Sequence, residues 1–456
     1  MNYIQKNYIM ELLRNSHFVK VLLIGFIVLL FQIPISKIKG VIEEREQTRE
    51  EAINEVTSKW GKSQVLTGPS IIVPYMNRFT TASSRSQSLS SIAYATFLPE
   101  SLKISGNLES QLLYRGIYKI PVYTMLLNVS GSFKAPDFSE WAIDAENILW
   151  DKAYLSLQVT DAWAMTKSPI LSWNNKELNF LPGAGEFEDN QDGLHVKIGD
   201  LSKGDNFDFS FSVGLNGSVG AFFVPFGRDT EVQLSSDWGS PSFQGTWLPT
   251  NRSVSSDGFK ATWNIPFLSR NFPQKWLPSP GLKKIIESSG FGVEMNSSID
   301  HYRMSQRSVK YQFLFLVLTF STLWLFEVLA KIRVHPIQYL LIGSGMCLFY
   351  LLELSLAEHF GFVQAYSLAS AAVVILVASY SAAVLKARKR AVIVGAVVTL
   401  LYIYLYILLM IESYALLAGS VGLFVALAAI MFLTRKVDWY SLTDTVISKA
   451  SINEEN

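Results

Sequence analysis

The stretch KIRVHPIQYLLIG, residues 331–343, places two cations, a histidine and a proline between two long apolar runs. Each run has about 20 residues, enough to cross the ~30 Å hydrocarbon core of a membrane as a helix. Proline lacks a backbone N–H and is tolerated in the first turn of a helix, so Pro336 suits the start of the second run. The stretch therefore predicts a tight polar turn between two membrane-crossing helices.

Six such apolar runs occur in the chain. The first, residues 19–36, follows a cationic start and lacks a small-residue cleavage site, which favours an uncleaved signal anchor over a signal peptide. The other five lie together near the C-terminus, at residues 311–330, 337–357, 363–385, 391–411 and 414–433. We therefore expect a multi-pass membrane protein with six transmembrane α-helices.

The charges between these runs predict an orientation. Lysine and arginine are enriched in cytoplasmic turns. They occur in the N-terminal segment, in the turn with Lys331 and Arg333, in the KARKR turn of residues 386–390, and just after the last run. The opposite turns, residues 358–361 and 412–413, carry no lysine or arginine. This pattern predicts that both termini are cytoplasmic and that residues 37–310 are periplasmic.

The predicted organisation has six parts. Residues 37–64 are rich in charged helix formers and are expected to extend the first membrane helix as a stalk. The remaining expected parts are a cytoplasmic N-terminus (1–18), the transmembrane signal anchor (19–36), a periplasmic β-rich domain (65–310), a five-helix transmembrane domain (311–434) and a cytoplasmic tail (435–456).

The large exported region has the period-two pattern of β-strands. The stretch FDFSFSVGLNG, residues 207–217, alternates phenylalanine with polar residues and ends on Asn216-Gly217, which suggests a turn. Residues 123–129, 155–160 and 259–267 alternate in the same way. We expect a mainly antiparallel, sandwich-like β domain, formed either as one folding unit or as two subdomains.

Composition excludes several classes of function. With 39 Lys+Arg against 38 Asp+Glu, the chain has no charge excess that would favour nucleic acid as a partner. The single cysteine, Cys347, can form neither an intramolecular disulfide nor a cysteine-based zinc site. The sequence contains no GxSxG, Walker, HExxH or EF-hand motif, so it offers no catalytic residues, and we expect no cofactor or metal.

Three polar residues in the membrane part are candidate functional residues: Glu327, Glu353 and His335. Ionisable groups inside a membrane are costly and are functional candidates by default. Glu327 is four residues before Lys331, a spacing that allows an ion pair. Glu353 is the deepest candidate, yet its distance from the outer boundary favours an interfacial or snorkelling role over a proton relay. For His335 we favour a role in turn geometry beside Pro336 over a cytoplasmic contact.

Several long blocks resemble one known family. HPIQYLLIG (335–343), FYLLELSLAEHFGF (349–362) and MFLTRKVDWYSL (431–442) resemble the CreD family of bacterial inner-membrane proteins. The resemblance extends through LTGPSIIVPY (66–75), FLPESLKISG (97–106) and SDWGSPSFQGTWLP (236–249). It implies an inner-membrane protein with a periplasmic domain, linked to envelope integrity, to tolerance of an E-type colicin and to a two-component stress response. It implies no enzymatic activity and no catalytic residues.

The favoured hypothesis is a non-enzymatic inner-membrane protein that supports envelope integrity and stress tolerance through its periplasmic β domain. Its expected partners are membrane lipids and a periplasmic envelope component or protein, with the oligomeric state left open. A conduit or flippase-like transporter using Glu353 and Glu327 is the alternative, because five helices beyond the anchor exceed what tethering requires. An envelope-modifying enzyme that uses periplasmic carboxylates is a weaker alternative.

Overall fold

The computed structural model describes residues 17–80, 88–185, 192–202, 204–295, 301–330, 334–385, 387–411 and 414–435. The chain forms two compact units. One, here called the helical unit, comprises Met1–Arg49 and Ile299–Asn456. The other, here called the β domain, comprises Glu50–Ser298.

Two nine-stranded sheets make up most of the β domain. The first contains β1 (Gln64–Thr80), β2 (Ser88–Phe97), β5 (Tyr154–Val159), β9 (Leu181–Pro182), β10 (Gly193–Lys197), β12 (Gly220–Phe223), β14 (Pro241–Gly245), β17 (Lys275–Trp276) and β18 (Phe291–Met295). The second contains β3 (Ser101–Arg115), β4 (Tyr118–Lys134), β6 (Met165–Lys167), β7 (Ile170–Trp173), β8 (Lys176–Asn179), β11 (Asn206–Ser218), β13 (Asp229–Ser236), β15 (Asn251–Ser255) and β16 (Gly258–Pro266).

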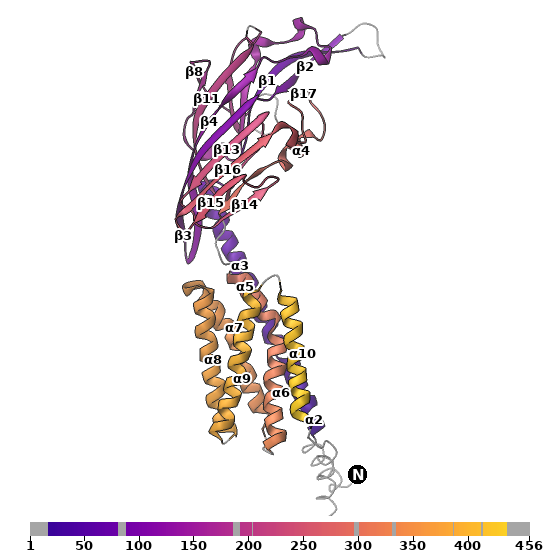
Figure 1. Ribbon diagram of the computed structural model, residues 1–456, viewed down its shortest axis with the longest axis vertical. Helices are drawn as coiled ribbons and strands as arrows, with labels where there is room; N and C mark the ends of the chain where they lie inside the picture. Colours follow the sequence, from indigo (N-terminus) through magenta and orange to yellow (C-terminus); the bar gives the residue numbers. More distant parts are fainter. Residues whose placement is uncertain are drawn as a thin grey trace, which may run out of the picture. The chain divides into compact units, whose positions relative to one another are not determined.

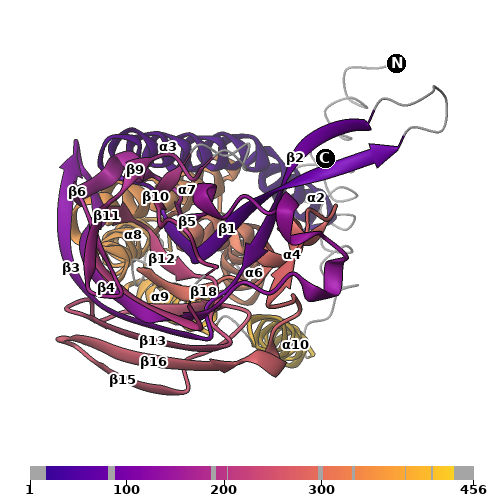
Figure 2. The ribbon, with the colours of Figure 1, turned by 90° about the horizontal axis from the view of Figure 1, so that it is seen from above.

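The sheets are mixed but mostly antiparallel. Most neighbouring strands of the second sheet are antiparallel, and the long β3–β4 hairpin turns at Gly116 (Figures 1 and 2). Two described pairs are parallel, β1 with β12 and β3 with β13. Both parallel pairs join strands far apart in the sequence, so the chain crosses between distant parts of each sheet. This confirms the predicted β-rich fold and adds a topology that strand patterns alone do not specify.

One hydrophobic core joins the two sheets, as in a sandwich. In β11 the alternating Phe207, Phe209 and Phe211 are all buried, as the period-two pattern predicts. Trp263 of β16 is fully buried and packs on Phe291 of β18, which belongs to the other sheet. The β domain is therefore one folding unit rather than two subdomains.

The predicted turn at Asn216-Gly217 is wrong. Strand β11 runs through both residues to Ser218, with Asn216 opposite Thr124 and Gly217 opposite Tyr123. A Cβ at Gly217 would meet the Tyr123 ring, whose hydroxyl donates a hydrogen bond to Gly220 O at 2.7 Å. The glycine therefore gives the tyrosine room inside the sheet rather than reversing the chain.

Short helices complete the β domain. They are the 3₁₀ turns η1 (Ser139–Trp141), η2 (Ala145–Asn147), η3 (Trp150–Lys152), η4 (Ala162–Ala164) and η5 (Phe267–Ser269), and helix α4 (Leu282–Ser288). The first three lie in one connection, between β4 and β5, and form the wall of a pocket described below.

Among the described residues, six helices are long and apolar enough to cross a membrane. The long helices are α2 (His17–Leu30), α3 (Gln32–Trp60), α6 (Gln312–Ala330), α7 (Pro336–Phe360), α8 (Phe362–Leu385), α9 (Arg388–Met410) and α10 (Ala415–Thr434). Helices α2 and α3 form one span, because backbone bonds from Phe31 to Ile27 O and from Ile35 to Phe31 O continue across their junction. The six predicted crossings are confirmed as apolar helices.

The chain returns to the helical unit through a short helix, α5 (His301–Lys310). The sequence places residues 65–310 together, whereas α5 packs on α7 and α9 (Figure 1). The physical reason is that one face of α5 is buried, at Tyr302, Ser305, Ser308 and Val309. Backbone bonds from Tyr311 to Ser308 O and from Phe315 to Tyr311 O then lead from α5 into α6.

Candidate functional site

His335 lies at the N-terminus of α7 and caps it. Its Nδ1 accepts a hydrogen bond from the Ile337 amide at 3.3 Å, and its own amide donates to Gln338 Oε1 at 2.9 Å. Together these bonds form a capping box that satisfies backbone donors at the start of the helix. Pro336 occupies the first turn. Pro336 therefore begins α7 and His335 caps it, whereas residues 331–333 of the predicted turn lie outside the described residues.

Glu327, near the C-terminal end of α6, is buried and paired. It forms an ion pair with the Lys20 ammonium of α2 and accepts a longer hydrogen bond, 3.5 Å, from the Tyr339 hydroxyl of α7. The sequence suggests Lys331 as its partner, but that residue lies outside the described residues. The side chain of Glu327 is 2% exposed and that of Lys20 is 23% exposed. The Lys20–Glu327 ion pair and the Tyr339 hydrogen bond therefore link α2, α6 and α7.

Glu353, for which the sequence predicts an interfacial or snorkelling role, is enclosed by the protein. The residue is 0% exposed, because α5 covers this part of α7. Its Oε1 accepts a hydrogen bond from the Ser305 hydroxyl at 2.8 Å, while its Oε2 has no hydrogen-bond partner. The tyrosines Tyr350 and Tyr366 are close enough to interact electrostatically with it.

A face of α5 and α6 carries buried neutral polar residues that the sequence argument missed. Ser305, Ser308, Gln312 and Thr319 recur at spacings of three, four and seven residues and are all at most 2% exposed. These spacings place them on one side of the helix. We call these four residues with Glu353 the polar face. The helical spacing was visible in the sequence, but serine and threonine inside apolar runs are also typical of plain helix packing.

Most of the polar face is not satisfied by the protein itself. Ser308 Oγ, Gln312 Nε2, Thr319 Oγ1 and Glu353 Oε2 are buried without a partner. A buried polar atom without a hydrogen bond costs about 1–3 kcal/mol, so four cost about 4–12 kcal/mol. This is comparable with the whole net stability of a typical domain, about 5–15 kcal/mol. The arrangement is costly for a helix interface that serves packing alone.

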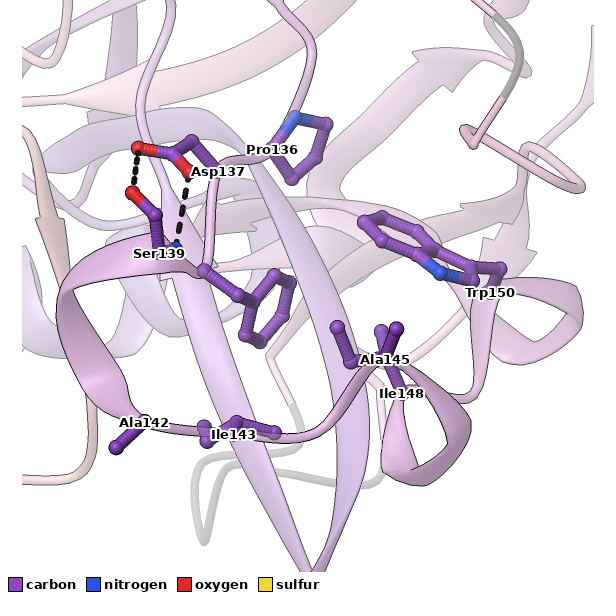
Figure 3. A pocket seen from close by; sticks show the side chains of 9 residues that line it. Pro136, Asp137, Ser139, Ala142, Ile143, Ala145, Ile148 and Trp150 are labelled. Atoms are coloured by element: carbon purple, nitrogen blue, oxygen red, sulfur yellow. Dashed lines mark hydrogen bonds between the residues drawn. The ribbon is translucent and has the colours of Figure 1, made fainter.

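The β domain offers a separate pocket with a volume of about 280 Å³, lined by residues 136–150 of the connection from β4 to β5 (Figure 3). Its lining is largely apolar, with Phe138, Ile143, Ile148 and Trp150 among the nine residues. Asp137 stands at its edge and binds Ser139, as the dashed lines in Figure 3 show. Hydrogen bonds from the Ser139 amide and hydroxyl and from the Lys275 ammonium lower the pKa of Asp137 from 3.8 to about 2. Asp137 is therefore a carboxylate at any physiological pH.

Neither place has the donor set of a metal site. Within the described ranges, no three His, Cys, Asp or Glu side chains gather closely enough to hold a metal ion. His195 hydrogen-bonds the Gly183 carbonyl at 2.8 Å through Nδ1 and packs on the ring of Tyr154. These contacts place His195 in the packing of the β domain.

Comparison with known proteins identifies the family. The sequence profile of the family described as "Inner membrane protein CreD" matches residues 16–440. The chain is 34% identical over 420 residues to the inner membrane protein CreD of Escherichia coli strain K12, covering 91% of this chain and 92% of that protein. The chain belongs to the CreD family.

Membership of the CreD family, together with six apolar helices, makes this a multi-pass inner-membrane protein. Solved structures add nothing to that assignment. An M1 zinc metallopeptidase from Deinococcus radiodurans aligns with 43% of this chain and 42% of its own, at 9% identity and a TM-score of 0.20. A point mutant of the same enzyme aligns equally poorly, with the same coverage, at 8% identity and a TM-score of 0.20. Likeness at this level carries no argument about the fold or chemistry of a CreD family member.

Proposed function

We propose that this CreD family member is a non-enzymatic protein that supports the integrity and stress tolerance of the bacterial envelope through its β domain. The β domain faces the periplasm and binds an envelope component or a protein partner. The observation that carries the proposal is a self-contained β domain, with one core shared by two sheets, in a chain whose other unit consists of membrane helices. Such a unit is large enough to present a binding surface independently of the membrane.

The pocket lined by the β4–β5 connection is one part of that surface that suits a partner. Its half-buried Ile143, Ile148 and Trp150 offer apolar area beside the charged Asp137. Binding sites commonly combine an apolar lining with a few polar groups that set orientation. The volume of about 280 Å³ suits one side chain or a small group of a larger partner rather than a whole small molecule.

Complementation tests this proposal. A strain lacking the protein would be challenged with detergent and a β-lactam, and then complemented with wild type, with Ala145→Trp, or with a chain whose β domain is replaced by an unrelated β-sandwich. Ala145 lines the pocket and is exposed, so a tryptophan there fills the pocket without disturbing the core. We expect the replacement to fail, and Ala145→Trp to reduce survival.

The matched control is Ala145→Ser, which leaves the pocket open and should restore wild-type survival. Membrane levels of every variant are measured first, so that loss of function is separated from loss of protein. Full rescue by the unrelated β-sandwich would contradict the proposal, because any folded domain of similar size could then replace the β domain and no specific binding surface would be needed. If Ala145→Trp restores survival while the unrelated β-sandwich does not, the partner binds the β domain at a surface other than this pocket.

A further inference from the structure

The polar face is a feature that tethering a β domain does not require. Its four unpartnered atoms belong to Ser308, Gln312, Thr319 and Glu353, each of which is at least nine-tenths buried. Buried polar groups in native proteins are normally paired, and an unpaired set in one place indicates bound water, an ion or a functional role. A hydroxyl and an amide can each donate a hydrogen bond to one water molecule and accept one from another, so they can connect neighbouring waters.

Acidic residues lie at the two ends of this face. Glu353 bonds to Ser305 at one end, and Glu327 bonds to Tyr339 at the other. Tyr339 and Glu353 are 14 positions apart on α7, which corresponds to about 21 Å along the helix. That distance covers most of the ~30 Å hydrocarbon core. Ionisable groups so placed are typical of proton relays in membrane proteins.

We propose that the polar face holds a file of water molecules and conducts protons between Glu353 and Glu327. In each step, one water oxygen accepts a proton from its neighbour and releases another to the next oxygen, so every water keeps two protons after transfer. Glu353 takes up a proton at one end and gives one to the first water of the file. Glu327 receives one from the last water and releases it to the solvent that reaches the partly exposed side chain of Lys20.

Protons fit this face better than metal cations do. No cluster of three metal-ligating side chains exists among the described residues, and the groups between the two carboxyls are neutral. Among the described residues, Tyr350 and Tyr366 lie near Glu353, and Glu358 is five positions further along α7. Arg307 of α5, the helix that covers Glu353, donates to the Leu408 carbonyl of α9 at 3.2 Å. Glu358 already binds Tyr302 and Arg45. Glu353 is therefore the acid available to the file at this end.

Two leucines interrupt the face and act as its barrier. Leu316 and Leu323 are 0% and 1% exposed and lie on the same side of α6 as Thr319. A file of water must pass Leu323 to reach Glu327. Leu323→Ala is therefore expected to increase proton flux, an effect that no purely structural role of the face would produce.

The test uses the full-length protein in liposomes that contain a pH-sensitive dye. Valinomycin and an outward potassium gradient set an inside-negative potential, and acidification of the interior is recorded. We expect wild type to exceed protein-free liposomes, Glu353→Gln and Thr319→Val to lower the flux about tenfold or more, and Leu323→Ala to raise it. The matched control is Thr399→Val on α9, because the Thr399 hydroxyl is already bonded within its own helix, to Gly395 O at 2.8 Å. Its flux should equal wild type.

Several results would overturn the proposal. They are a wild-type flux equal to that of empty liposomes, equal fluxes in wild type and Glu353→Gln, or a flux that requires sodium and leaves the internal pH unchanged. If Glu353→Gln is lost during purification, Leu323→Ala decides, since an unchanged flux there contradicts the barrier and the file together. The liposomes contain no envelope component, so failure here leaves the proposed role of the β domain intact.

Discussion

At the scale of single residues, the ion pair between Lys20 and Glu327 shows how burial sets the importance of a charge. The two side chains are 307 positions apart in sequence, and their exposed fractions differ, 23% for Lys20 against 2% for Glu327. A partly exposed ammonium on a flexible stem can reach water if its partner is lost. The Glu327 carboxylate, only 2% exposed, has much less access to water.

This asymmetry predicts an order of stabilities. Removing one partner of a buried pair costs about 3–5 kcal/mol, because the other charge is left uncompensated. We expect Lys20→Met to destabilise the protein in detergent more than Glu327→Gln does, since it isolates the more buried charge. The double variant should be more stable than Lys20→Met alone. Thermal unfolding followed by size-exclusion chromatography measures all three.

A strictly additive result in this cycle would show that the two residues do not interact energetically. The variant Lys39→Met serves as the control. Lys39 is exposed and pairs with exposed Glu43 at 3.5 Å, and pairs of this kind contribute about 0–1 kcal/mol. Its unfolding temperature should therefore stay close to wild type.

At the scale of elements, one arginine holds together three connections of the β domain. Arg270 follows η5, is 7% exposed, and donates through Nη1 to the carbonyls of Pro225 and Phe226 at 3.2 and 3.0 Å. It also donates to Gln274, whose amide binds the carbonyls of Leu98 and Pro99. Burial, and then the nearby charge of Arg228, lower the pKa of Arg270 from 12.5 to about 10, so the guanidinium stays charged at neutral pH.

Arg270→Lys is therefore not a conservative change. Lysine lacks the planar fork that serves several acceptors, and it cannot stack flat over Phe272, whose ring centroid is 4.7 Å from the guanidinium carbon. We expect a loss of about 1–3 kcal/mol in the stability of the β domain, measured by denaturant unfolding with tryptophan fluorescence. The exposed Arg252, 6.0 Å from the Phe243 ring, is the control, and Arg252→Lys should change stability by less than about 0.5 kcal/mol. Equal losses of stability for Arg270→Lys and Arg252→Lys would show that the contribution of Arg270 does not depend on its burial or on its forked hydrogen bonds.

The sequence predicts the helices and strands better than it predicts the contacts between them. Apolar length fixes each membrane helix, and alternation fixes strands such as β11, because both depend on local chemistry. The parallel pairing of β3 with β13, and the pairing of Glu327 with Lys20, join distant residues and leave no local pattern. The polar face was missed for a related reason: Ser308 and Thr319 become unusual only once their neighbours are known to offer no partner.

At the scale of the whole molecule, the arrangement of charge predicts how the chain lies in the membrane. Four cations lie within residues 386–390, and Lys331, Arg333, Arg435 and Lys436 flank other helix ends that should face the same side. Cationic segments near helix ends are retained in the cytoplasm. With an even number of crossings, we expect both termini on that side, and the β domain, which lies between the first and second crossings in sequence, on the other.

Labelling of introduced cysteines tests this orientation. Cys347 is buried and is the single native cysteine, so Cys347→Ala gives a background without thiols. Asp151→Cys adds an exposed thiol to the β domain, and Arg435→Cys adds one at the end of α10. An impermeant maleimide should label the thiol at 151 in intact spheroplasts and the thiol at 435 only after the membrane is opened. Labelling at 435 but not at 151 would invert the topology, and it would remove the β domain from the compartment in which we propose it acts.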